Sequence, residues 1–243
     1  MIFYRRLKPV TAISFDLDDT LYSNAPVMMA TERFMVNYFE KNLPRNTTPY
    51  DYRYWSSFRR QAIADNPKLA HDVGALRLQT YFLGINVLVN AEQQARVLAN
   101  AAMNEFNHHR SHFDVPQVSH RLLNSLAKHF PLIAISNGNV DTQKIGLAHY
   151  FQHIYHADLT QQQKPSTDMF VKACNALAIA PHQLLHVGDC GHSDIYGAIK
   201  AGCQTAWVST YNVGQPLSVL PSIALTQVEQ LQRLIPSDKV DNI

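Results

Sequence analysis

Residues 15–22 read Phe-Asp-Leu-Asp-Asp-Thr-Leu-Tyr and end a short apolar run. The β-branched and aromatic content of residues 11–16 predicts a buried strand. Charges at the carboxyl end of a strand in an open α/β sheet lie in the crevice where such folds bind ligands. Asp16 and Asp18 alternate with Leu17, so in an extended segment both carboxylates point into one pocket. Because like charges this close repel, the pair implies a bound divalent metal, acid–base chemistry, or both.

Beyond residue 116 the sequence alternates between helix and strand patterns. We expect helices at 117–129, 140–149, 167–178 and 193–201, and strands at 132–135, 154–156, 184–187 and 205–208. This spacing is typical of a parallel, doubly wound sheet, to which the strand at 11–16 also belongs. The fold class is therefore expected to be α/β with a Rossmann-type core.

The region between that first strand and residue 112 has a different pattern and reads as helices only. They are expected near 25–41, 49–64, 68–84 and 91–109. The block is thus an insert, which divides the chain into a core at 1–22 and 113–243 and a helical domain at 23–112. The last seven residues, from Ser237, are expected to be frayed.

Composition narrows the class of protein. The 243 residues carry a formal charge of +2 without a long Lys/Arg run, which argues against nucleic acid or a membrane surface as a partner. Three cysteines, Cys174, Cys190 and Cys203, are too few for a disulfide framework and fit a reducing cytosol. No apolar stretch approaches a membrane span, and the N-terminus lacks a secretory signal. A soluble cytoplasmic protein is expected.

Four short motifs accompany the predicted strands. They are residues 16–20, Ser136-Asn137-Gly138, Lys164-Pro165, and residues 188–194, which read Gly-Asp-Cys-Gly-His-Ser-Asp. Because the carboxyl ends of parallel strands lie along one edge of a sheet, the four motifs should converge.

This ordered set resembles the haloacid dehalogenase superfamily, whose members are mostly phosphatases. The resemblance covers the whole chain and includes the DxDxT signature at 16–20 and the GDxxxxD motif at 188–194. The helical insert is similar to that family's C1-type cap. Residues 15–22, 114–117 and 185–189 resemble bacterial phosphatases that act on flavin mononucleotide and on 5-amino-6-(5-phospho-D-ribitylamino)uracil, a riboflavin precursor. A small-molecule phosphate ester is the expected partner.

The paired aspartates suit phosphate ester hydrolysis. Asp16 is the candidate nucleophile, because a carboxylate can attack phosphorus and form an aspartyl-phosphate that water later cleaves. Asp18, on the same face, can protonate the leaving alkoxide and then deprotonate the attacking water.

Four further residues are candidates for binding the phosphoryl group. Ser136 and the backbone N–H of Asn137 can donate hydrogen bonds to its oxygens, and Lys164 supplies a fixed positive charge. The resemblance adds Thr20, the last residue of the DxDxT signature, to this substrate-binding set.

Charge counting supports a metal ion. Asp16, Asp18, Asp189 and Asp194 bring four negative charges, and Lys164 alone cannot balance them together with a substrate dianion. Mg²⁺ suits carboxylates, phosphate and water. By resemblance, its ligands are the Asp16 carboxylate, the Asp18 backbone carbonyl and Asp189, while Asp194 holds metal waters or Lys164.

Four functions other than a riboflavin-related phosphatase are compatible with the sequence. They are a promiscuous sugar-phosphate or nucleotide phosphatase, a true haloacid dehalogenase, a phosphomutase, and a binding module without turnover. The cap aromatics either stack on a substrate ring or form the cap's own core; they are Tyr50, Tyr52, Tyr54, Trp55 and Phe58. Cys190 is either an oxidation-sensitive thiol beside the metal or an inert small side chain. A cap that opens and closes would use hinges near 21–25 and 112–116.

Overall fold

A computed structural model describes residues 1–235, and the fraying expected from Ser237 lies outside this range. Within it the strands form one sheet. They are β1 (Ile2–Phe3), β2 (Ala12–Phe15), β3 (Leu132–Ser136), β4 (His153–His156), β5 (Leu184–Gly188), β6 (Gln204–Val208) and β7 (Ile223–Leu225).

The strand order is β1-β7-β6-β5-β2-β3-β4, and neighbours are parallel except for β1, which runs antiparallel to β7. The strand β2 lies between β5 and β3, so successive connections wind outward from it in opposite directions. Such a switch point opens a crevice beyond the carboxyl ends of the strands. The α/β doubly wound prediction is confirmed, and the end of β2 lies at this crevice.

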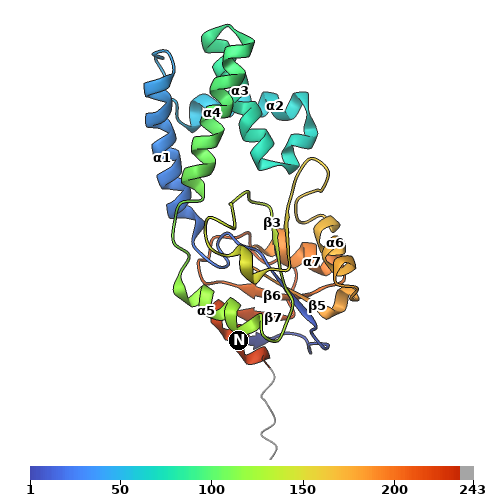
Figure 1. Ribbon diagram of the computed structural model, residues 1–243. Coiled ribbons are helices and arrows are strands. Elements are labelled where there is room, and N and C mark those ends of the chain that lie inside the picture. Colours follow the sequence, from blue (N-terminus) through green and yellow to red (C-terminus); the bar gives the residue numbers. More distant parts are fainter. Residues whose placement is uncertain (236–243) are drawn as a thin grey trace, which may run out of the picture.

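Alternate strand residues face opposite layers of helix. On one face Ile13 and Phe15 belong to a buried apolar cluster with residues of α5 (Gln117–Leu126) and the 3₁₀ segment η5 (Val228–Leu234). On the other face Ala12 packs in a cluster with α6 (Asp168–Ala176). Figure 1 shows the sheet between these layers. Burial on both faces holds β2 in register and fixes where its last residue points.

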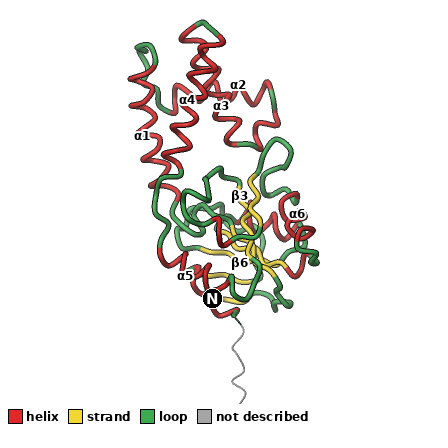
Figure 2. Tube along the Cα trace, viewed as in Figure 1, coloured by secondary structure: helices red, strands yellow, loops and turns green. Residues whose placement is uncertain are grey.

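The insert forms a separate helical group, which lies at one end of the molecule in Figure 2. Its elements are α1 (Asn24–Asn42), α2 (Tyr52–Asp65), the 3₁₀ segment η1 (Pro67–His71), α3 (Val73–Val89) and α4 (Glu92–Arg110). The group has its own apolar cluster, whose buried members lie between Met35 and Phe106. The domain boundaries at 22/23 and 112/113 stay a prediction.

Three local predictions were wrong. The helix expected at 68–84 is η1 followed by α3, because Asp72 ends the first and caps the second by accepting a hydrogen bond of 2.8 Å from the Ala75 N–H. The helix expected at 140–149 consists of turns and a 3₁₀ segment, η2 (Ala148–Tyr150), since Gly146 adopts a left-handed φ of 72°.

The helix expected at 193–201 is a wide π-turn, η4 (Gly191–Tyr196), followed by α7 (Gly197–Lys200). The short strands β1 and β7 were not predicted, because runs of two and three residues carry no readable alternation. None of the helices within residues 1–235 combines the length and apolarity needed to span a bilayer.

Candidate active site

A tight loop after β2 presents the signature aspartates. The carbonyl of Leu17 accepts hydrogen bonds from Thr20 N (3.3 Å) and Leu21 N (3.0 Å), which reverses the chain. Asp19 takes a left-handed φ of 57°, and its side chain accepts a hydrogen bond of 2.8 Å from the backbone of Asn24, the first residue of α1. The loop therefore connects the end of β2 directly to the first helix of the insert.

Lys164 lies at the centre of the site. Its Nζ donates hydrogen bonds of 2.7 Å to Asp16 Oδ1, to Asp194 Oδ1 and to the carbonyl of Ile135. The side chain is almost completely buried, and all three ammonium hydrogens have an acceptor. Because the ammonium is buried and hydrogen-bonded to two carboxylates, it is a positive charge fixed in position beside Asp16.

Three carboxylates converge beside this lysine. One oxygen each from Asp16, Asp189 and Asp194 lies within 4.8 Å of the other two, and all three residues are buried. Carboxylate oxygens are hard donors that suit divalent cations such as Mg²⁺ or Ca²⁺. The residues present therefore fit a divalent metal site.

The pKa shifts support the same conclusion. Burial raises the pKa of Asp189 to about 7, with the charges of Asp194 and Asp19 acting in the same direction. Burial also raises the pKa of Asp16 well above its ordinary range, although the ammonium of Lys164 opposes this. A divalent cation would favour the ionised form of both carboxylates.

Asp194 differs from these two. Burial alone would raise its pKa, but Lys164 and the hydrogen bond with His186 lower it below the ordinary value. Asp194 Oδ1 faces Lys164 and His186, and its Oδ2 accepts a hydrogen bond of 2.9 Å from the Cys190 N–H. With both oxygens engaged, Asp194 is better suited to holding Lys164 than to ligating a metal directly.

His186 and Gly188, both on β5, support Asp194. The imidazole lies 3.3 Å from Asp194 Oδ1 through Nε2 and 2.9 Å from Ser14 Oγ through Nδ1. A Cβ at Gly188 would come within 2.3 Å of the Asp194 carboxyl carbon, so only glycine permits this approach. Sequence reasoning missed His186, because one histidine in an apolar strand gives no signal of its own.

Asp18 has different partners from Asp16. Arg110 Nη2, at the end of α4, donates to both of its oxygens, at 2.6 and 2.8 Å. The hydroxyl of Tyr22 donates to Asp18 Oδ1 at 2.7 Å. Arg110 is buried and was not identified from the sequence, where an arginine in a last helical turn is unremarkable.

The remaining candidates also lie at this edge of the sheet. Thr20 Oγ1 is 3.5 Å from Asp189 Oδ1, and Ser136 Oγ accepts a hydrogen bond of 3.1 Å from the N–H of Gly138. The Asn137 side chain pairs twice with the Lys164 backbone, at 2.7 and 2.9 Å. Asn137 thus positions the lysine loop, which leaves its backbone N–H for the contact expected with phosphate. Substrate binding by these residues stays a prediction.

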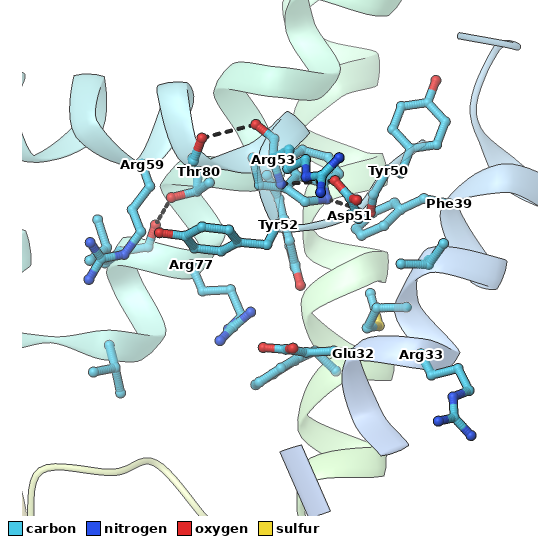
Figure 3. Close-up of a pocket in the computed structure, with 18 of the residues that line it drawn as sticks. Glu32, Arg33, Phe39, Tyr50, Asp51, Tyr52, Arg53, Arg59, Arg77 and Thr80 are labelled. Carbon is cyan, nitrogen blue, oxygen red and sulfur yellow. Dashed lines mark hydrogen bonds between the residues drawn. The ribbon is translucent and has the colours of Figure 1, made fainter. Parts of the chain in front are cut away.

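A cavity of about 580 Å³ lies within the helical insert (Figure 3). Its lining is aromatic and basic and includes Phe39, Tyr50, Tyr52, Trp55, Tyr81, Phe106, Arg33, Arg53, Arg59 and Arg77. In Figure 3, Glu32 and Arg77 point toward one another from opposite walls. Phe106 precedes Arg110 by four residues on α4, a helical rise of about 6 Å. Phe106, which lines the cavity, therefore lies about one helical turn from Arg110.

The aromatic residues of the insert serve mainly as its core. Tyr50 and Trp55 are buried in the apolar cluster, with Tyr54 and Phe58 packed against it, whereas Tyr52 is 76% exposed. Tyr50, Tyr52 and Trp55 also line the cavity, so both interpretations of these residues apply in part.

Comparison with known proteins agrees with the motifs. A family model described as haloacid dehalogenase-like hydrolase matches residues 10–202. The 5-amino-6-(5-phospho-D-ribitylamino)uracil phosphatase YigB of Escherichia coli (strain K12) is 35% identical over 242 residues, which cover 97% of this chain and 100% of the relative. A glyceraldehyde 3-phosphate phosphatase of Pyrococcus furiosus is 24% identical and covers 83% of this chain and 81% of its own length. The crystal structure of a 2-haloacid dehalogenase from Pseudomonas syringae pv. Tomato DC3000 has a TM-score of 0.86 and 27% identity, covering 93% of this chain and 97% of that one.

Proposed function

The chain belongs to the haloacid dehalogenase-like hydrolase family, and we propose that it is a Mg²⁺-dependent phosphatase of small phosphate monoesters. The observation that carries the proposal is the grouping of Asp16 and Lys164 with Asp189 and Asp194, with Asp18 two residues from the nucleophile. A cationic amine and a divalent ion beside a nucleophilic carboxylate are what a phosphate dianion requires.

In the first half-reaction, Asp16 attacks phosphorus. Lys164 holds Oδ1, so Oδ2 is the oxygen left to form the new O–P bond. As the ester P–O bond breaks, Asp18 in its acid form transfers a proton to the leaving oxygen, and the alcohol departs. The product of this step is an aspartyl-phosphate on Asp16.

In the second half-reaction, Asp18 is a base. It takes a proton from water, the water oxygen bonds to phosphorus, and the O–P bond to Asp16 breaks, which releases phosphate. Asp16, Asp189 and the Asp18 carbonyl would hold Mg²⁺, which neutralises charge on the phosphoryl oxygens when bound. Thr20, Ser136 and the Asn137 N–H complete the phosphate site, and Asp194 holds Lys164 in place.

We further propose residues 23–112 as a cap that closes over the substrate, with hinges near 21–25 and 112–116. The cap cavity has a volume suited to a small organic group, aromatic walls on which a planar ring can stack, and arginines for polar substituents. One relative, 35% identical in sequence, is a 5-amino-6-(5-phospho-D-ribitylamino)uracil phosphatase, and this similarity supports that compound as the substrate. Flavin mononucleotide is the second choice. We place the reaction in the cytoplasm, with no role for nucleic acid or membrane.

A dehalogenase is the second candidate, because a structure of similar fold at 27% identity bears that name. Such enzymes also use an aspartate nucleophile, but attack carbon and need neither a metal nor the second aspartate. The presence of Asp18, together with the buried cluster of Asp16, Asp189 and Asp194, favours phosphate as substrate.

One screen tests the proposal. Phosphate release would be measured over several dozen metabolites, including both riboflavin-related compounds, with Mg²⁺ and with chelator, and halide release from 2-haloacids in parallel. Mg²⁺-dependent phosphate release is expected. Halide release without a metal, and no phosphate release from any ester, would replace this function with that of a dehalogenase.

A further inference from the structure

Arg110 makes a side-chain contact between the helical insert and the signature loop. It is the last residue of α4, and its Nη2 donates to Oδ1 and Oδ2 of Asp18 at 2.6 and 2.8 Å. The arginine side chain is 3% exposed and that of Asp18 is 20% exposed. A contact to both oxygens of a carboxylate fixes the direction in which the carboxylate faces as well as its position.

Tyr22 and Gly138 define the rest of the surroundings of Asp18. The Tyr22 hydroxyl donates to Oδ1, and Tyr22 is itself buried against Phe113 with ring centroids 4.8 Å apart. A Cβ at Gly138 would lie 2.6 Å from Asp18 Oδ2, so this oxygen contacts the loop that follows β3 and carries Ser136. Oδ1 therefore accepts hydrogen bonds from Tyr22 and Arg110, whereas Oδ2, which Arg110 also contacts, lies against the loop that carries Ser136.

A proton donor works only within hydrogen-bond reach of the leaving oxygen, about 2.6–3.2 Å between heavy atoms. Asp18 lies in a loop, and its own rotamers would spread the carboxylate over a wider range than this. A planar guanidinium restricts that range more than the flexible, rotatable ammonium of a lysine would.

We propose that Arg110 is a positioning residue for proton transfer by Asp18, a role that rests on the phosphatase function proposed above. The arginine holds Oδ2 toward the leaving oxygen, so that this oxygen gives its proton as the ester bond breaks. Because Arg110 ends α4, the position of the insert also determines whether Asp18 is aligned.

The test is the dependence of the Arg110→Met defect on the leaving group. In kcat/KM with Mg²⁺, the loss should be about 10²-fold or more for an alkyl ester such as glycerol phosphate, whose alkoxide needs a proton. It should be under about threefold for para-nitrophenyl phosphate, whose phenolate leaves without one. Loss of a residue that only binds phosphate or stabilises the fold would lower kcat/KM for both substrates by the same factor. Equal losses therefore overturn the proposal.

Two variants provide the controls. In an Asp18→Asn background, Arg110→Met should add less than about a twofold loss, since the proton donor it positions is gone. Arg96→Ala removes an exposed arginine of the same helix that pairs with Glu92, and should leave both substrates unaffected. If Arg110→Met does not fold, Arg110→Lys keeps the charge and should show the same leaving-group contrast in weaker form; wild-type behaviour of Arg110→Lys on both esters overturns the proposal.

A second readout does not depend on turnover. In a crystal structure of Arg110→Met or Arg110→Lys, the Asp18 carboxylate should leave its position beside Gly138, and an unmoved carboxylate overturns the proposal. A wild-type enzyme that hydrolyses no phosphate ester contradicts the phosphatase function, and the position of the Asp18 carboxylate then still shows whether Arg110 holds it.

Discussion

Lys164 Nζ and Asp16 Oδ1 lie 2.7 Å apart although 148 positions separate the two residues in the chain. The contact joins the loop before α6, which carries Lys164, to the end of β2, which precedes Asp16. In the chain, Asp16 precedes β3 and Lys164 follows it. It occupies one oxygen of Asp16 and leaves the other for the proposed attack on phosphorus. The same ammonium contacts Asp194 at 2.7 Å, so the lysine connects Asp16 to the loop after β5.

Replacing the nucleophile should separate chemistry from folding. Asp16→Asn is nearly isosteric, but an amide cannot form the aspartyl-phosphate, so turnover should fall by at least about 10³-fold. The thermal midpoint should remain within a few degrees of wild type. Steady-state phosphate release and calorimetry check the two expectations. If the variant retains a tenth of wild-type activity, another residue is the nucleophile.

Removal of the divalent ion should abolish activity and lower the stability of the fold. A cation present at 100 times its Kd stabilises the folded state by about 2.7 kcal/mol through mass action. Chelator should therefore lower the melting temperature of the wild type, and Mg²⁺ should restore both stability and turnover. Asp189→Asn should lose most of the Mg²⁺-induced shift. Asp65→Asn, which alters an exposed carboxylate at the end of α2, should keep it.

The buried imidazole of His186 should make stability depend on pH. Burial lowers the pKa of His186 in the folded state, although the hydrogen bond with Asp194 opposes this. Below about pH 6.5 the unfolded chain binds a proton at this residue that the folded chain does not. The contribution of His186 to the free energy of unfolding is therefore complete above pH 6.5. It falls as pH decreases, by at most ~1.4 kcal/mol per unit.

Denaturant unfolding between pH 5 and 7.5, in chelator, measures this slope. His186→Asn should be less stable than wild type at pH 7.5 but should show a shallower decline toward pH 5. His129→Asn, which alters an exposed histidine, serves as the control and should follow the wild-type slope. Parallel curves for wild type and His186→Asn would show that the imidazole does not resist protonation.

Filling the cap cavity should change substrate choice without changing the reaction. Ser56 lines the cavity and its neighbour Ser57 does not, although both lie on α2. Ser56→Trp should lower kcat/KM by about tenfold or more for a phosphate ester with a large planar ring, and by less than about threefold for glycerol phosphate. Ser57→Trp should leave both values near wild type. The same loss on both esters would place the substrate ring outside this cavity.

The sequence was sufficient to predict which motifs meet. Asp16 and Asp189 directly follow parallel strands, Ser136 is the last residue of another, and the carboxyl ends of parallel strands share one edge of the sheet. Lys164 follows a fourth strand by several residues, and its convergence with them could be expected from the order of elements alone. Three of the four inserted helices were also predictable from long helical segments, whereas the one expected at 68–84 is divided at Asp72.

Other features depend on contacts that a local pattern does not contain. Arg110 sits in a last helical turn, where arginine is common for reasons unrelated to a distant aspartate. From the sequence, His186 is an ordinary residue of a buried strand, and its contact with Asp194 is visible only in the structure. The segment 140–149 forms turns and a 3₁₀ segment instead of the predicted helix, because Gly146 adopts a left-handed conformation that ends a helix.

The separate apolar cluster of the inserted helices bears on how such enzymes diversify. Its buried members come only from the insert. The inserted helices can therefore be exchanged for others without removing a side chain from the apolar clusters that pack on the sheet. A chimera that combines this core with a foreign helical group should retain its phosphoryl chemistry and acquire the selectivity of the donor. Such a transplant would still have to end its last helix with an arginine opposite Asp18.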